Sequence, residues 1–240
     1  MQLIGKKKSS VYDFWQFWLD CLFPKQCFVC QNEGEYLCSA CFDKVKLAKN
    51  QCYLCHKETD ALGLCVACQA ETKIDELVVA ASYRESVSGL LVESLKYNYV
   101  EAVAEDLISL FIKRLKRDGL EDIFQRQTFI PIPLHKKRLV ERGFNQSELL
   151  AKYLACYFNG HVDASCLKRQ RPTAQQAKLT RQGRLDNMKM AFTTADRRIY
   201  PNAVVLVDDV VTTGSTLSEA AKILKANGVK KIIAVAMCHG

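Results

Sequence analysis

The sequence predicts an α/β protein in which a parallel β-sheet carries helices on both faces, preceded by a small module of paired cysteines. Short apolar runs alternate with helical patterns along residues 75–240, which is typical of a doubly wound parallel sheet. The run Val204–Val207 is continuously apolar, as in strands that are buried on both faces. Four Cys-x-x-Cys pairs within 42 residues predict the module.

Three segments follow from these patterns. Residues 1–24 have apolar side chains on one helical face, so we expect an amphipathic helix that packs on the body, with a membrane-surface helix as the alternative. Asp13 and Asp20 interrupt any signal-peptide core, and no apolar run approaches the roughly 20 residues of a membrane span. Residues 25–74 hold the cysteine pairs, and residues 75–240 form the α/β body.

The body divides into strands and helices in a regular order. The apolar run "ELVVAAS" opens the first strand, and Leu217, Ala220, Ala221 and Leu224 recur at three- and four-residue steps in the last helix, which Gly228 ends. We expect strands at 76–83, 128–132, 203–208 and 230–237, and helices near 85–97, 100–117, 144–158 and 215–227.

The paired cysteines predict structural metal sites. Two Cys-x-x-Cys turns can present four thiolates in a tetrahedron, so the natural interpretation is two structural Zn2+ sites in two zinc ribbons, in a reducing cytoplasm. Redox-active or disulfide-bonded pairs are the alternative. The spacing leaves sequential and interleaved ligation equally open, and His56 can replace a cysteine or lie beside the site. The predicted metal ligands are Cys27, Cys30, Cys38, Cys41, Cys52, Cys55, Cys65 and Cys68.

The stretch "VVLVDDVVTTGST" predicts a ligand site at the carboxyl end of a strand. Small hydroxyl residues around Gly214 let backbone N–H groups close around a phosphate at the start of the next helix. Asp208 and Asp209 suit sugar hydroxyls or a hard cation such as Mg2+. One loop can therefore hold both ends of a ribose phosphate. The alternative is an acidic turn that caps an ordinary helix, with Thr213 or Ser215 as the N-cap.

Positive charge is concentrated in the middle of the body. Residues 134–189 contain 12 basic and 4 acidic residues. The net charge of this window is therefore +8, the same as that of the whole chain. A solvated basic face is one interpretation; a polyphosphate or nucleic-acid site is the other. The segment "PIPLHKKRLVERGFNQ" follows a predicted strand, and "LKRQRPTAQQAKLTRQGRLDNMKMAF" is long, polar and rich in hydrogen-bond donors, as in a functional lid, with a disordered linker as the alternative.

These motifs resemble known families. "VVLVDDVVTTGST" resembles the ribose-phosphate loop of type I phosphoribosyltransferases, which use phosphoribosyl pyrophosphate (PRPP) and Mg2+. Together with "LKYN", "RGFNQ", "RPTAQQ" and the cysteine pairs, it resembles the ComF family, which is connected with DNA uptake in natural transformation. The resemblance implies a type I phosphoribosyltransferase-like sheet preceded by a double zinc ribbon.

The resemblance also implies roles for individual residues. Asp208 and Asp209 would hold the ribose hydroxyls and, with Arg142, act in catalysis. The ribose phosphate would be bound by Thr212, Thr213, Gly214, Ser215 and Thr216. The pyrophosphate and the lid would involve His135, Lys136, Arg138, Arg142, Arg171, Thr173, Gln176 and Arg184.

Two functions of different classes remain open from the sequence. The first is a cytoplasmic phosphoribosyltransferase that moves ribose 5-phosphate from PRPP onto an acceptor. The second is a non-catalytic component that senses PRPP or binds single-stranded DNA and meets the DNA-uptake machinery. Intact carboxylates and a complete lid favour the enzyme, whereas the basic window and the ribbons favour the binder.

Overall fold

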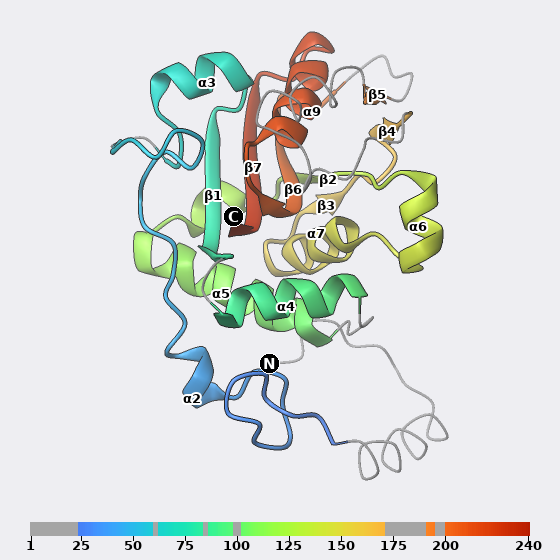
Figure 1. Ribbon diagram of the computed structural model, residues 1–240. Coiled ribbons are helices and arrows are strands. Elements are labelled where there is room, and N and C mark those ends of the chain that lie inside the picture. Colours follow the sequence, from blue (N-terminus) through green and yellow to red (C-terminus); the bar gives the residue numbers. More distant parts are fainter. Residues whose placement is uncertain (1–23, 60–61, 84–85, 98–101, 171–190, 195–199) are drawn as a thin grey trace.

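A parallel sheet forms the centre of the protein. The computed structural model describes residues 24–59, 62–83, 86–97, 102–170, 191–194 and 200–240. The five strands lie in the order β1-β7-β6-β2-β3 (Figure 1), and all neighbours run parallel. Their bounds are Glu76–Ser82 for β1, Lys231–His239 for β7, Ala203–Val211 for β6, Thr128–Pro131 for β2 and His161–Val162 for β3. A separate antiparallel pair consists of β4 (Leu167–Arg169) and β5 (Phe192–Thr194).

Helices cover both faces of the sheet, as the sequence predicts. Val205 and Val207 of β6 belong to a hydrophobic core shared with three helices, namely α4 (Ser86–Tyr97), α5 (Ala102–Asp118) and α7 (Gln146–Tyr157). Val204 and Leu206 belong to a second core, which contains the apolar face of α9 (Ser215–Ala226). Because side chains alternate along a strand, a run buried on both faces must be apolar at every position.

The described elements agree with the expected order and differ at some ends. Strand β6 runs on to Val211 because it stays paired with β7 beyond the apolar run, with Asp208 opposite Ala236. The short helix α6 (Lys136–Arg142) and the strands β3, β4 and β5 were not expected, because segments of two to seven residues carry too few positions for a period. The described part of the chain also contains the short helices α2 (Ser39–Phe42) and α3 (Val66–Thr72) and the 3-10 helix η1 (Glu121–Phe124).

The strand order places the ligand site between β2 and β6. From β2 the chain moves outward to β3, whereas from β6 it moves the other way to β7, so the winding of the sheet reverses between these two neighbours. Ligands of open α/β sheets bind outside the carboxyl ends of the strands at such a reversal. The loop after β6 and the segment that leads into α6 both start at this edge.

The two cysteine-rich segments pack on different faces of the sheet. Cys27 and Cys41 belong to the core that contains α5, whereas Cys52 and Cys68 belong to the core that contains α9. In Figure 1 the first segment lies near α2 and the second near α3. The chain between them runs along the edge strand β1, where Ala48 N–H donates to Ala80 O at 2.8 Å. The connection thereby pairs with the otherwise open edge of the sheet.

Two predicted segments fall largely outside this description. The amphipathic helix at 1–24 lies outside the described residues except for Pro24, and so does most of the predicted lid. Among the helices that the structure describes, none is long and apolar enough to cross a membrane.

Candidate phosphate and metal sites

The loop after β6 forms a small pocket at the start of α9. Gly214 is the N-cap residue of α9 and has φ of +69°, a left-handed conformation that glycine adopts without steric cost. The pocket is lined by Asp208, Val210, Val211, Thr212, Gly214, Ser215, Thr216 and Leu217. Thr213 donates its hydroxyl to Ser215 Oγ at 3.1 Å. No side chain caps α9, so the alternative of Thr213 or Ser215 as N-cap is wrong, and the helix presents backbone amides to the pocket.

The two carboxylates are held by different helices. Asp208 Oδ1 accepts hydrogen bonds from Ser147 Oγ at 3.0 Å and from the Asp209 N–H at 2.9 Å. Asp209 Oδ2 lies 3.1 Å from Lys96 Nζ, and the two side chains are only 15% and 17% exposed. Burial and the neighbouring Asp209 raise the pKa of Asp208 to about 7, in spite of the two hydrogen bonds and the Lys96 charge. The pKa of Asp208 therefore lies near neutral pH, where this carboxyl can gain or lose a proton.

The segment after β2 is shaped by the residues of "RGFNQ". Gly143, with φ of +76°, ends α6, and Asn145 begins α7 by accepting from the Ser147 N–H at 3.2 Å. The Asn145 amide also donates to Ile132 O at 3.0 Å, which ties the start of α7 to the end of β2. This local structure brings Ser147 to Asp208. The motif contains Gly143 because α6 ends in a left-handed conformation, and Asn145 because its side chain caps the start of α7.

The basic residues of this segment lie on and beside α6. His135 is the N-cap residue and accepts from the Lys137 N–H at 3.3 Å. Lys136 is exposed, Arg138 is partly buried, and Arg142 donates to Gln146 Oε1 at 3.1 Å. The structure thus places the four predicted basic residues at the same edge of the sheet as the carboxylates.

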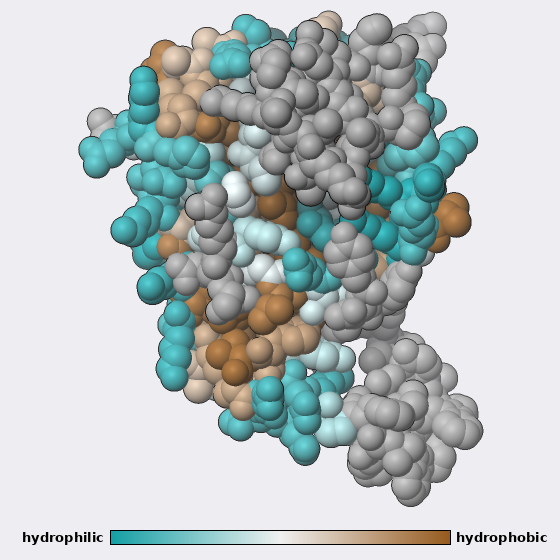
Figure 2. All heavy atoms as spheres, in the orientation of Figure 1, coloured by the Kyte–Doolittle hydropathy of each residue, from teal (hydrophilic) through white to brown (hydrophobic). Residues whose placement is uncertain are grey.

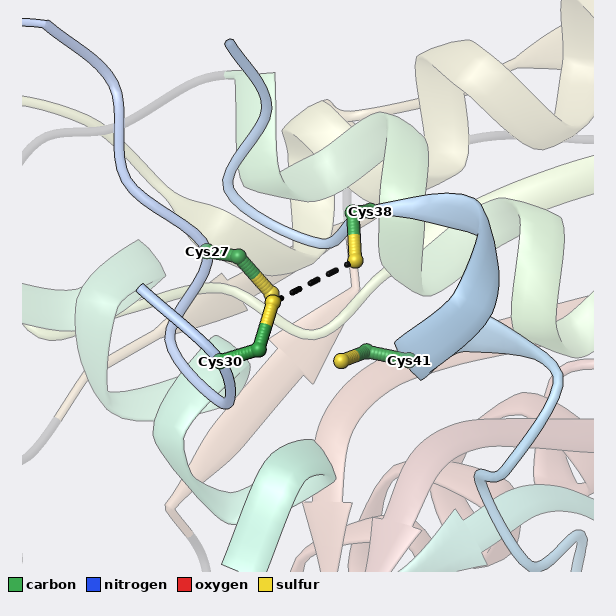
Figure 3. A group of neighbouring side chains, drawn as sticks. All are labelled: Cys27, Cys30, Cys38 and Cys41. Carbon is green, nitrogen blue, oxygen red and sulfur yellow. Dashed lines mark hydrogen bonds between the residues drawn. The ribbon is translucent and has the colours of Figure 1, made fainter. Parts of the chain in front are cut away.

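The eight predicted metal ligands form two groups of four. The Sγ atoms of Cys27, Cys30, Cys38 and Cys41 converge, with Cys30 and Cys38 at 3.6 Å (Figure 3). In the second group Cys55 and Cys65 are 3.7 Å apart, and in both groups all Sγ atoms lie within 4.8 Å of one another. The cysteines are therefore grouped in sequential order, which the spacing left open. The second group consists of Cys52, Cys55, Cys65 and Cys68.

Each group is built in the same way. A tight turn carries the first two cysteines, closed by the Gln31 N–H on Cys27 O and the His56 N–H on Cys52 O. The third cysteine, Cys38 or Cys65, is the N-cap residue of a short helix. His56 is exposed and is not part of the second group.

The thiols are arranged to hold a cation. Burial opposes ionisation of Cys27 and Cys52, but backbone N–H groups around each sulfur lower both pKa values to about 6. Burial and the other thiols raise the pKa of Cys41 to about 12 and also raise that of Cys68. Each group thus combines one cysteine with a lowered thiol pKa, Cys27 or Cys52, with one whose thiol pKa is raised, Cys41 or Cys68. Four sulfurs in one cluster fit the tetrahedral thiolate coordination of Zn2+.

Comparisons with known proteins place the chain in a family. The family described as "Phosphoribosyl transferase domain" matches residues 144–240. The DNA utilization protein YhgH of Escherichia coli O157:H7 is 31% identical over 230 residues, which cover 90% of this chain and 97% of that protein. This chain belongs to the ComF/YhgH family.

Other relatives carry related names. Competence protein F of Haemophilus influenzae is 29% identical over 222 residues, which cover 84% of this chain and 96% of that protein. Competence protein ComFC of Bacillus subtilis is 28% identical over 207 residues, covering 81% of this chain and 80% of that protein. The resemblance to the ComF family and the phosphoribosyltransferase-like fold, both predicted from the sequence, are confirmed.

Several residues at the ComF/YhgH site escaped sequence reasoning. Lys96 lies within "LKYN" and Ser147 directly follows "RGFNQ", so both are next to residues of predicted motifs. Nothing in the sequence indicated that Lys96 contacts Asp209 or that Ser147 contacts Asp208. Arg169 stacks over the Phe192 ring at 5.4 Å, and burial, followed by the charge of Arg138, lowers its pKa. The charge of Asp208 opposes these two effects, since it raises the pKa of Arg169.

The surface around α6 is mostly polar, with two exposed apolar side chains on the helix itself. Figure 2 shows hydrophilic side chains gathered over this region, and Leu139 and Val140 are exposed beside the lysines. The predicted lid residues lie outside the described residues: Arg171, Thr173, Gln176 and Arg184.

Proposed function

We propose that this ComF/YhgH-family protein binds PRPP with Mg2+ and transfers its ribose 5-phosphate to a nucleophilic acceptor. One observation carries the proposal: at the reversal point of the sheet, a carboxylate pair leads directly into an uncapped helix start shaped by Gly214. An ordinary helix cap needs neither the paired carboxylates nor the left-handed glycine. A ribose phosphate needs acceptors for its hydroxyls and donors for its phosphate, and this loop supplies both.

The residues divide the substrate between them. Backbone amides and hydroxyls of residues 212–216 receive the 5-phosphate at the positive end of α9. Asp208 and Asp209, in the C-terminal part of β6, accept hydrogen bonds from the ribose hydroxyls in this proposal. His135, Lys136, Arg138 and Arg142 lie at the end of the adjacent strand, where they attract the pyrophosphate group.

The reaction breaks the bond between the ribose C1 atom and a pyrophosphate oxygen and forms one between C1 and the acceptor. The bonding electron pair leaves with pyrophosphate, and the proton that the acceptor loses is released to water. Arg142, oriented by Gln146, and its basic neighbours stabilise the negative charge that develops on the leaving group. The carboxylates stabilise positive charge that develops on the ribose ring. Bound Mg2+ would neutralise part of the pyrophosphate charge and would be held with the help of Asp208 and Asp209.

Lys96 offsets the negative charge of Asp209 in the ligand-free chain. Its ammonium lies 3.1 Å from Asp209 Oδ2, where the negative charge of the carboxylate attracts a cation. With Mg2+ and the ribose bound, Asp209 would have other partners, and Lys96 would be available to contact the substrate.

We further propose structural Zn2+ in both cysteine groups of a double zinc ribbon at 25–74, a phosphoribosyltransferase-like domain at 75–240, and a cytoplasmic setting, which keeps thiols reduced. Relatives named for competence and DNA utilization support a role in DNA uptake. Binding of single-stranded DNA is the second candidate function, because Lys136 and Lys137 are exposed on α6. PRPP turnover is favoured over a pure DNA groove by the carboxylate pair.

Calorimetry with PRPP and Mg2+ tests the binding function. We expect saturable binding by the wild-type chain and none measurable for a variant with Asp208→Asn and Asp209→Asn, which keeps the volume of both side chains. Release of pyrophosphate across a panel of acceptors, with and without single-stranded DNA, then tests transfer. Equal affinity of wild type and the double variant would overturn the assignment of the carboxylates. Binding without pyrophosphate release under every condition would favour the PRPP-sensing alternative.

A further inference from the structure

The second cysteine group packs directly against the phosphate loop. The turn that joins Cys52 to Cys55 presents Leu54, whose side chain is buried behind Gly214. A Cβ atom added to Gly214 would lie 2.6 Å from Leu54 Cδ2 and 3.2 Å from Cδ1. Leu54 therefore fills the space on the inner side of the loop and limits the conformations that residues 212–214 can adopt.

The same turn also supports the strand end beside the loop. The rings of Tyr53 and His56 lie 5.4 Å and 5.3 Å from the ring of His239, at the end of β7. The next residue, Gly240, donates its N–H to Val211 O at 2.9 Å, at the point where β6 enters the loop. Contacts from one turn thus reach the loop both directly and through β7.

The first cysteine group has no comparable position. Cys27, Leu37 and Cys41 pack in the core on the other face of the sheet, with α4 and α5. Its turn and the second turn share the same hydrogen-bond pattern, so the two groups are alike in local structure and differ in what they touch. This difference offers a control within one chain.

We propose that the turn from Cys52 to Cys55 is a part of the phosphate site, in which Leu54 is a positioning residue for the loop. Cation binding by the second group holds the turn, and the turn holds residues 212–216 in the conformation that receives phosphate. Phosphate affinity therefore depends on the metal of the second group and not on that of the first. The affinity part of this inference rests on the proposed binding of PRPP.

The side chain is tested first. Leu54→Ala removes the contact with Gly214, whereas Leu54→Met keeps an apolar side chain of similar volume. We expect both variants to retain the wild-type zinc content. Leu54→Ala should weaken PRPP–Mg2+ binding in calorimetry about tenfold, about 1.4 kcal/mol, and Leu54→Met should bind within about threefold of wild type. Equal affinity of all three proteins would overturn the role of Leu54.

The metal is tested with matched cysteine variants of the full chain. Cys55→Ser and Cys30→Ser each remove the second ligand of one group, and each should lower the zinc content by about one ion. Hydrogen exchange of the amides of residues 212–217 is measured without ligand, so this result does not depend on PRPP. We expect faster exchange in Cys55→Ser and Leu54→Ala, and wild-type exchange in Cys30→Ser.

The two experiments separate the inference from the proposed function. If the wild-type chain does not bind PRPP, the proposed function fails, and the exchange pattern still decides whether the turn controls the loop. If the wild-type chain binds PRPP but both cysteine variants lose affinity and loop protection equally, the inference fails and PRPP binding stands. Protection that is unchanged in Cys55→Ser and Leu54→Ala would also overturn it.

Discussion

The ion pair between Lys96 and Asp209 should stabilise the ligand-free protein in a pH-dependent way. Replacement of Lys96 by methionine keeps an unbranched side chain that is one atom shorter and removes its charge. At 3.1 Å and an effective dielectric constant of about 20, the attraction between the charges is about 5 kcal/mol. Part of this is offset by the desolvation of two side chains that are mostly buried. We therefore expect Lys96→Met to lower the free energy of unfolding by about 2–3 kcal/mol at pH 8.

The size of this loss should shrink at lower pH. The folded protein holds the pKa of Asp208 near 7, well above its ordinary value of 3.8, so the folded state takes up a proton there before the unfolded state does. Falling pH through 7 therefore stabilises the folded state with respect to this group. Because Lys96 lowers the pKa of Asp208, its removal raises that pKa further. Protonation of Asp208 therefore stabilises the folded variant more than it stabilises folded wild type. The difference in the free energy of unfolding between the two proteins becomes smaller at pH 5.5.

Denaturant unfolding at pH 8 and pH 5.5 measures both effects, in a double-mutant cycle with Asp209→Asn. Asp209→Asn keeps the shape of the carboxylate and removes its charge. The coupling energy between the two substitutions should exceed about 1 kcal/mol at pH 8 and be smaller at pH 5.5. Mg2+ should restore part of the stability of Lys96→Met, since it can replace the missing cation. A coupling energy below about 0.5 kcal/mol at pH 8 would refute the reasoning.

Three further predictions concern the pH, the metals and DNA. Affinity for PRPP–Mg2+ should fall by up to about tenfold per pH unit below 7 as Asp208 takes up a proton. Calorimetry on Asp208→Asn separates this effect from titration of the ligand, and parallel pH profiles of wild type and variant would contradict the prediction. Metal analysis should find about two Zn2+ per chain, and chelation should lower the melting temperature and expose the cysteines to a thiol reagent. A metal-free protein, or disulfides among the eight cysteines, would rule out the zinc sites. Affinity for single-stranded DNA should fall steeply with salt, and a variant in which Lys136, Lys137 and Arg138 are replaced by glutamine should bind all sequences more weakly with a shallower salt slope. An unchanged slope in fluorescence anisotropy would show that DNA contacts another surface.

The sequence by itself determined the features that are carried by neighbouring residues. The continuous apolar run of β6, the three- and four-residue steps of α9 and the repeated Cys-x-x-Cys spacing each follow from local geometry, because strands, helices and tight turns impose short periods on the chain. The phosphate loop is local in the same sense, since its carboxylates, its hydroxyls and Gly214 are consecutive. For these reasons the fold class and the center of the candidate site could be predicted without coordinates.

Only the tertiary structure decided which distant residues complete the site. Spacing allows sequential and interleaved cysteine groups equally, and the choice depends on how the chain passes along β1 to opposite faces of the sheet. The pairing of Lys96 with Asp209 and the seating of Leu54 behind Gly214 join segments far apart in the sequence. Such contacts arise from the packing of whole helices and turns on the sheet. They produce no repeating pattern in the sequence, because the residues around each partner reflect only the local helix, strand or turn in which that partner lies.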